Sequence, residues 1–218
     1  EIGALCRKHG ILFHTDAVQA AGHLTIDVQR DNIDMLSLSA HKFHGPRGIG
    51  LLFANSNIQL TSLIRGGGQE RGKRAGTENL PGIIGLAAAL KDAQENMQAN
   101  TAYITGLRDA LRNGLDKIDG ASFNGSREHC LPGTVNYSFQ GVNGEALLSL
   151  LSNEGICCSS GSACSAGSLE PSHVLLALGL SHETAQSALR FSLCEYNTID
   201  EVQTIITKVT EAVNRLRR

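Results

Sequence analysis

One lysine of this chain directly follows an apolar stretch, in the run Ser39-Ala40-His41-Lys42. An amine at the mouth of a buried strand is partly removed from water and can act as a nucleophile toward a carbonyl carbon. The hydroxyl of Ser39 and the imidazole of His41 add hydrogen-bond donors that suit a phosphate group. For this tetrapeptide alone, a solvated lysine at a strand end is the commoner situation. Its meaning therefore depends on residues elsewhere in the chain.

A carboxylate earlier in the chain also ends an apolar stretch. Asp16 closes the run Ile11–Thr15, and Gln19 follows three residues later. A carboxylate in that position can keep a pyridine nitrogen protonated, which makes the ring an electron sink. Asp16 taken alone is more often the N-cap of a helix. An aspartate and an S-x-H-K run, each at a strand end, together favour the cofactor interpretation.

A second polar segment, residues 66–77, combines glycines with cationic side chains in the sequence GGGQERGKRAGT. It can present backbone N–H groups, guanidinium groups and the hydroxyl of Thr77 to an anion. Contact with nucleic acid is the competing interpretation. The segment has no aromatic side chains, however, and the chain carries a net charge of −2, so we expect no nucleic-acid partner.

Small residues surround one of the six cysteines, Cys164, in the run SSGSACSAG. Nothing nearby can bury the thiol in a large apolar pocket, so we expect it to be accessible, as a reactive thiol must be. The other cysteines favour packing roles. They are Cys6, Cys130, Cys157, Cys158 and Cys194, of which Cys157 and Cys158 lie on an expected strand. No C-x-x-C pair is present, which favours free thiols in a reducing compartment such as the cytoplasm.

Short apolar strands must position the residues of the first third. We expect strands over Ile11–Thr15, Asp34–Ala40 and Ile49–Ala54, in a sheet covered on both faces. Apolar residues at helical spacing then predict a helix over Leu80–Met97 and a second helical segment over residues 103–118. Polar residues at the carboxyl ends of strands are typical of ligand sites in open α/β sheets.

The remainder of the chain has an α+β pattern. In chain order we expect strand Thr134–Phe139, helix Glu145–Asn153, strand Gly155–Ser159, a loop over Ser160–Ser168, a short helix from Pro171 and a strand over Leu189–Leu193. A last helix begins at the capping box Thr198-x-x-Glu201.

Length and composition fit a folded chain of one or two domains. The 218 residues are 41% hydrophobic, which is enough for a substantial core. No apolar run approaches the roughly 18 residues that a membrane span needs, so we expect no membrane segment. We place the boundary between a glycine-rich part, residues 1–97, and an α+β part, residues 98–218.

Four runs together resemble the cysteine desulfurases of the NifS/IscS type: HTDAVQAAG, SLSAHKFHGPRGIG, GGGQERGKRAGTENLPGIIG and CSSGSACSAGSLEPSHVLLALG. The resemblance covers essentially the whole chain. It implies an α/β fold, that of the pyridoxal-phosphate (PLP) transferases of fold type I, which aspartate aminotransferase shares. Residues 1–97 would be the C-terminal part of the PLP-binding large domain, and residues 98–218 the small α+β domain. The first half of the large domain is expected outside this chain, in cis or in another polypeptide.

The resemblance implies a role for five residues around the cofactor. Lys42 matches the Schiff-base lysine, and Asp16 matches the partner of the pyridine nitrogen. Gln19 matches the residue near the phenolic oxygen of the cofactor. Ser39 and His41 match ligands of its phosphate group.

The resemblance also implies three roles outside that set. Thr77 matches a threonine that reaches the phosphate of the neighbouring subunit in a homodimer, and Cys164 matches the cysteine that forms a persulfide. Arg190 matches the arginine that binds the substrate carboxylate, for which a bidentate guanidinium is suited. The chain departs from the family pattern at Cys194-Glu195, where Gly-Arg is usual.

The implied reaction converts L-cysteine to L-alanine, through a PLP aldimine and a persulfide on Cys164. The sulfur would then pass to an iron–sulfur scaffold protein or another acceptor, where Cys164 could transiently ligate a cluster. A related PLP lyase or aminotransferase, or a truncated non-catalytic remnant, is the alternative. Cys164 in its small-residue loop favours the desulfurase, because an aminotransferase needs no thiol.

Overall fold

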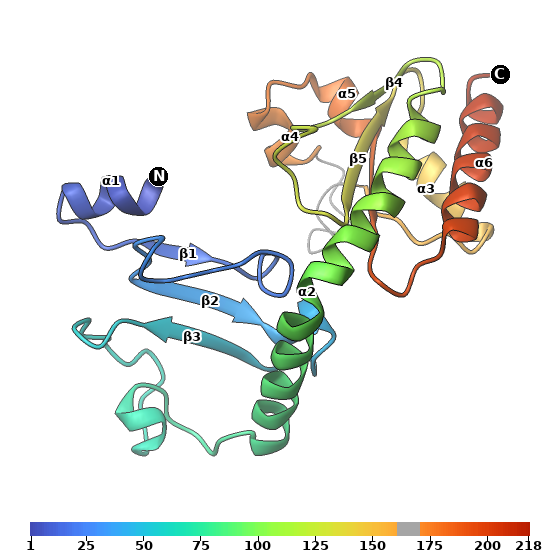
Figure 1. Ribbon diagram of the computed structural model, residues 1–218. Helices are drawn as coiled ribbons and strands as arrows, with labels where there is room; N and C mark the ends of the chain where they lie inside the picture. The colour runs from blue at the N-terminus through green and yellow to red at the C-terminus, as the bar shows by residue number, and fades with distance from the viewer. Residues whose placement is uncertain (161–170) are drawn as a thin grey trace. The chain divides into compact units, whose positions relative to one another are not determined.

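The computed structural model describes residues 1–160 and 171–218. Its contacts divide the chain into two compact units, Glu1–Gln98 and Ala99–Arg218. Each unit has a three-stranded sheet of its own (Figure 1). Helix α2, Leu80–Leu115, begins in the first unit and ends in the second. Within the described residues, no helix combines the length and the apolar character that crossing a bilayer requires.

The sheet of the first unit has the strand order β1-β2-β3 and follows helix α1 (Ile2–Lys8). Strand β1 (His14–Asp16) runs parallel to β2 (Met35–Ser39), and β3 (Gly50–Ala54) runs antiparallel to β2. The three strands expected from the sequence are therefore present: β2 and β3 lie within their expected bounds, and β1 is shifted along the chain.

The largest shift is at the first strand, which begins at His14 and not at Ile11. The N–H group of Phe13 donates to the side-chain Oδ2 of Asp34 at 2.8 Å, so a side-chain bond replaces a ladder bond there. Ile11 and Leu12 precede the strand and are exposed. The strand also extends one residue further than expected and includes Asp16.

The core of the first unit lies on one face of its sheet. Alternation along β2 buries Leu36 and Leu38, while Ser37 and Ser39 lie on the opposite face. The buried members of this core are Ala17, Ala21, Leu36, Leu38, Ala40, Phe43 and Leu86. The expected cover on both faces is therefore present on one face only among the described residues of this unit.

The second unit has an antiparallel sheet with the strand order β4-β5-β6. Strand β5 (Thr134–Phe139) has the bounds expected from the sequence and pairs with β4 (Ala121–Phe123) and β6 (Ala188–Ser192). Helices α3 (Gly144–Asn153) and α6 (Ile199–Leu216) pack on one face with the second half of α2 (Figure 1).

The opposite face of this sheet meets two short helices, α4 (His173–Ala177) and α5 (His182–Gln186). Their buried residues Leu175 and Ala185 cluster with Ala188 of β6. The helix expected from Pro171 is thus two helices, the first beginning at His173.

Two further expected elements need correction, and the expected capping box is confirmed. The two helical segments of the middle region form one helix, because residues 98–102 (QANTA) contain neither glycine nor proline to stop it. The strand expected over Gly155–Ser159 is absent, and only Ser159 forms a bridge, to Arg190. The capping box is confirmed: Thr198 N–H donates to Glu201 Oε2 at 2.8 Å, and Glu201 N–H donates to Thr198 Oγ1 at 3.2 Å.

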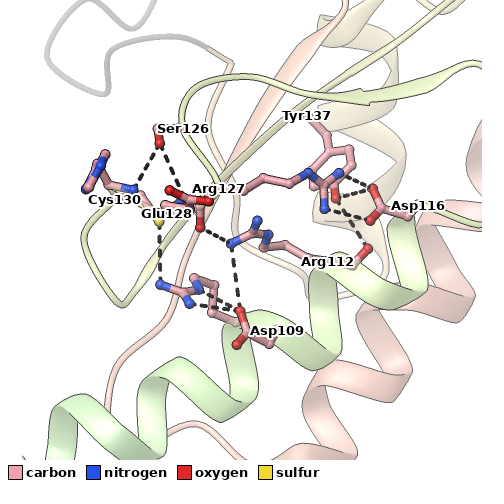
Figure 2. Close-up of polar contacts among 10 residues, drawn as sticks. Asp109, Arg112, Asp116, Ser126, Arg127, Glu128, Cys130 and Tyr137 are labelled. Carbon is pink, nitrogen blue, oxygen red and sulfur yellow. Dashed lines mark hydrogen bonds and ion pairs between the residues drawn. The ribbon is translucent and has the colours of Figure 1, made fainter.

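A polar cluster joins the loop after β4 to the end of α2 (Figure 2). Arg127 donates two hydrogen bonds to the Asp116 carboxylate, at 2.7 and 2.9 Å, and the Tyr137 hydroxyl donates to it at 2.7 Å. Hydrogen bonds from Arg127 and Tyr137 lower the pKa of Asp116, although burial acts in the opposite direction. The guanidinium groups of Arg112 and Arg127 also lie over the Phe123 ring. Their Cζ atoms are 4.6 and 5.3 Å from the ring centroid, respectively.

Candidate active site

Two of the expected site residues end neighbouring parallel strands. Asp16 is the last residue of β1, and Ser39 is the last residue of β2. The register places Asp16 beside Ser37, on the face that also carries Ser39. Asp16 Oδ1 accepts a hydrogen bond from Val18 N–H at 3.0 Å, so this exposed carboxylate caps the following turn with one oxygen. The cap therefore does not use the other carboxylate oxygen.

A single 3-10 turn, Ala40–Phe43, positions Lys42 immediately after β2. Ala40 and Phe43 are buried in the core, whereas His41 is exposed and Lys42 is half-buried. Ser39 Oγ lies 2.8 Å from His41 Nδ1, which joins the hydroxyl and the imidazole expected to bind a phosphate. The turn thus places an amine and a hydroxyl–imidazole pair at one strand end.

Close backbone packing holds this turn in place. A Cβ at Gly45 would lie 2.8 Å from the Cβ of Ala40, and a Cβ at Gly85 of α2 would lie 2.5 Å from Pro46 Cγ. Real Cβ atoms essentially never approach this closely, so only glycine permits this contact between α2 and the Lys42 turn.

The other two expected cofactor residues of the first unit are exposed. Gln19 lies in the turn that follows β1, three residues after Asp16. Thr77 lies between the short 3-10 helix η2 (Gln69–Gly72) and α2. The cation-rich segment before Thr77 is held by Gln69, whose Oε1 accepts from Gly76 N–H at 3.1 Å.

Arg190 belongs to the second unit and has an unusual polar environment. Its Nε atom is buried and has no hydrogen-bond partner among the described residues. A guanidinium group has donors only, and a buried donor without an acceptor costs about 1–3 kcal/mol. An anionic ligand would supply the missing acceptor, which fits the expected carboxylate.

The backbone of Arg190 is fixed by Ser159. Arg190 N–H donates to the Ser159 carbonyl at 2.7 Å, and Ser159 N–H donates to the Arg190 carbonyl at 3.0 Å. Ser159 precedes Cys164 by five residues in the sequence. Cys164 itself lies outside the described residues.

The other cysteines near Cys164 differ in accessibility. Burial raises the pKa of the Cys158 thiol to about 11, with a smaller contribution from Cys157. Cys158 packs against the core of the second unit, as expected. The expectation that Cys157 is packed is wrong, because this residue is exposed in the irregular segment that replaces the expected strand. The described cysteines are free thiols.

Asn136 is a candidate that motif reasoning missed. It lies on β5 directly opposite Arg190 in the sheet register. The available signal was the alternation of polar and apolar residues along Thr134–Phe139, which places Asn136 and Ser138 on one face.

A parallel strand pair that ends in a lysine-bearing turn, together with an α+β unit, defines an α/β protein. The model of the aminotransferase class-V family matches residues 1–205, and the chain belongs to this family. The expected fold, that of the PLP-dependent aminotransferase-like proteins, is confirmed for the part that the chain contains.

Individual relatives carry more specific names. The chain is 48% identical over 220 residues to cysteine desulfurase IscS of Clostridium botulinum, covering 100% of this chain and 55% of the relative. The X-ray structure of a NifS-like protein from Rickettsia africae is 31% identical, with a TM-score of 0.91, over 98% of this chain and 56% of that one. A structure of SspA in complex with cysteine is 39% identical, with a TM-score of 0.70, over 90% and 54%. The chain thus spans about half the length of the curated relatives it matches.

Proposed function

We propose that this chain forms the lysine-bearing and cysteine-bearing part of a PLP-dependent cysteine desulfurase, which converts L-cysteine to L-alanine and retains the sulfur on Cys164. The names of the relative from Clostridium botulinum and of the cysteine-bound structure support this activity. The structural observation that carries the proposal is the buried Nε of Arg190, which has no hydrogen-bond partner among the described residues. An anionic ligand such as an amino-acid carboxylate would supply the acceptor.

The residues at the ends of β1 and β2 have the chemistry that PLP requires. Lys42 offers a half-buried amine, and Ser39 and His41 offer a hydroxyl–imidazole pair for the phosphate group. Asp16 offers a carboxylate oxygen for the pyridine nitrogen, where it would hold a proton. Gln19, three residues further on, would serve the phenolic oxygen.

Different residues of the chain would carry out proton transfer and substrate binding. PLP, when bound, supplies an electron-withdrawing ring that stabilises negative charge at the substrate Cα. The Lys42 amine moves the Cα proton, as a positioned general base and acid. Arg190 binds and orients the substrate carboxylate through its fixed guanidinium plane.

Sulfur transfer requires a thiolate, and we assign this role to Cys164. Its sulfur attacks the substrate sulfur, so that an S–S bond forms while the substrate Cβ–S bond breaks. The electron pair of the broken bond stays with Cβ, which is protonated and becomes the alanine methyl group. Ser159, five residues before Cys164 in the sequence, supports this assignment because its backbone is hydrogen-bonded to that of Arg190.

Partners follow from the same resemblance. We propose a homodimer in which Thr77 reaches the phosphate group bound by the neighbouring subunit, and an iron–sulfur scaffold protein as sulfur acceptor. Residues 1–97 would belong to the large domain and residues 98–218 would form the small domain. Thr77 supports the dimer because this residue is exposed in the described structure.

Product analysis tests the proposed activity. With the first half of the large domain supplied in cis or as a second polypeptide, the PLP-loaded protein should form alanine from L-cysteine, with sulfide released in equal amount when a reducing thiol is present. Lys42→Ala should abolish alanine formation, whereas Lys91→Ala, at an exposed lysine of α2, should not change it. A keto-acid product would instead indicate an aminotransferase or lyase, and the absence of any product would indicate a non-catalytic remnant.

A further inference from the structure

The strand register places Asn136 and Arg190 on the same face of the second sheet. They are directly opposite each other on β5 and β6. Their neighbours Tyr137 and Leu189 form the next pair and are fully buried in the core. Because side chains alternate along a strand, Asn136 and Arg190 project from the opposite face, with their Cβ atoms about 5 Å apart.

A chain of hydrogen bonds determines which way the Asn136 amide points. The carbonyl of Thr184 can only accept, so Ser138 Oγ, 2.8 Å away, must donate to it. Ser138 Oγ must then accept the hydrogen bond from Asn124 Nδ2 at 2.8 Å. The same Asn124 amino group donates to Asn136 Oδ1 at 2.7 Å.

These hydrogen bonds determine which atom of each amide is oxygen and which is nitrogen. Turning the Asn124 amide by 180° would set its oxygen against the lone pairs of Ser138 Oγ. Turning the Asn136 amide would set two donors against each other. Asn136 therefore directs its oxygen toward Asn124 and keeps its amino group as a donor, which has no acceptor among the described residues.

We propose that Asn136 is a second donor for the α-carboxylate of the substrate, beside Arg190, and that Asn124 and Ser138 position it. Two adjacent groups that only donate suit a ligand that only accepts, and each oxygen of a carboxylate would meet one of them. This inference rests on the proposed function for the identity of the ligand. The donor pair itself rests on the geometry alone.

Ligand titrations of the PLP-loaded holoenzyme test the proposal. L-Cysteine and cysteamine, which lacks the carboxylate, are each titrated while the visible absorbance of the cofactor is followed. Asn136→Asp replaces the donor with an anionic acceptor beside Arg190. We expect this variant to raise the Kd for L-cysteine at least about tenfold and to change that for cysteamine less than about twofold.

Three other variants sharpen the comparison. Asn136→Ala removes the donor without adding charge and should raise the Kd for L-cysteine by about three- to tenfold. Asn124→Ala frees the Asn136 amide to rotate and should produce a smaller increase. Asn113→Asp makes the same charge change at an exposed residue of α2 and should bind both ligands like the wild type.

The ratio of the Kd for L-cysteine to the Kd for cysteamine distinguishes a specific loss of carboxylate binding from general damage to the fold. Equal weakening of cysteine and cysteamine binding would overturn the proposal, because it would indicate general damage to the site. Wild-type cysteine binding by a folded Asn136→Asp variant would also overturn it, and Asn136→Ala decides the question if the aspartate variant does not fold. If the wild-type protein forms no alanine and the selective loss is still seen, the proposed function fails and the carboxylate site stands.

Discussion

At the scale of single residues, the proposed role of Arg190 would exchange stability for binding. Its buried Nε has no acceptor among the described residues, and a buried donor left without one costs about 1–3 kcal/mol. A carboxylate ligand would offset that cost, so the same atom that weakens the free fold strengthens ligand binding. An Nε atom without a partner among the described residues is therefore consistent with a binding role.

Lys42 gives the residue-scale prediction. If its amine holds the cofactor, borohydride treatment of the PLP-loaded protein should fix the cofactor to Lys42, because reduction converts an imine into a stable amine. Peptide mapping of the reduced protein would then find the label on the peptide that contains Lys42. Label on another lysine, such as Lys73 of the glycine-rich segment, would contradict the assignment.

The residues that motif reasoning found and missed differ in a physical way. Lys42 and Asp16 are recognisable because each is a charged residue at the end of an apolar run. Arg190 was proposed only because it matches the family pattern. Asn136 is a neutral residue within a strand, and its importance depends on a register with Arg190 that is set by contacts more than fifty residues apart. No local pattern carries that information.

At the scale of elements, the Asp116 cluster gives a pH-dependent prediction. Arg127 and Tyr137 lower the pKa of Asp116 in the folded state, so its stabilising contribution is complete above the ordinary aspartate pKa of about 3.9. That contribution is lost as the pH falls toward the lower folded-state pKa. Asp116→Asn should cost about 1–2 kcal/mol at pH 7, reduced by the partial exposure of the carboxylate, and should flatten the acid limb of the stability profile.

Urea unfolding at several pH values measures this effect. Asp119→Asn, at an exposed aspartate three residues further on, serves as the control and should leave the profile unchanged. A profile for Asp116→Asn as steep as that of the wild type would show that other carboxylates dominate acid unfolding.

Helix α2 offers a second element-scale prediction, with two of its glycines as a matched pair. Gly85→Ala introduces a Cβ 2.5 Å from Pro46 Cγ, so we expect a loss of about 1–3 kcal/mol and displacement of the Lys42 turn. Gly106→Ala meets no atom within 4 Å and should stabilise the helix by about 0.5–1 kcal/mol. Thermal unfolding measures both, and equal effects of the two substitutions would refute the packing argument.

Elements were predictable where local and tertiary preferences agree. The ends of β5 and the capping box at Thr198 follow from residue types alone. The short strand β4 was missed because three residues carry too little pattern, and its pairing with β5 decides its conformation. The strand expected over Gly155–Ser159 does not form because only Ser159 meets a partner strand.

At the scale of the whole molecule, the two units differ in how completely they are packed. The second unit buries Val135, Tyr137 and Phe139 of its central strand completely. In the first unit, both faces of the edge strand β3 expose leucines, Leu51 and Leu52. The relatives, whose length is nearly twice that of this chain, have further residues with which such apolar surface can pack.

This difference predicts a gradient of hydrogen exchange. In the 218-residue chain, the amides of β5 should exchange most slowly, because opening them requires unfolding the larger core. The amides of β3 should exchange much faster, as expected for an edge strand with exposed side chains. Hydrogen exchange, measured by mass spectrometry on peptides from each strand, tests this prediction. Equal protection of the β3 and β5 amides would contradict it.

The central claim, that L-cysteine is desulfurised onto Cys164, is tested most directly by following the sulfur atom. The PLP-loaded protein is given one equivalent of L-cysteine carrying labelled sulfur, and its peptides are mapped under non-reducing conditions. The label should appear on Cys164 together with an equal amount of alanine, and Cys158, whose raised pKa of about 11 keeps it a thiol at neutral pH, should carry none. Label on Cys157 or Cys158, or alanine formed at the wild-type rate by Cys164→Ser, would contradict the account.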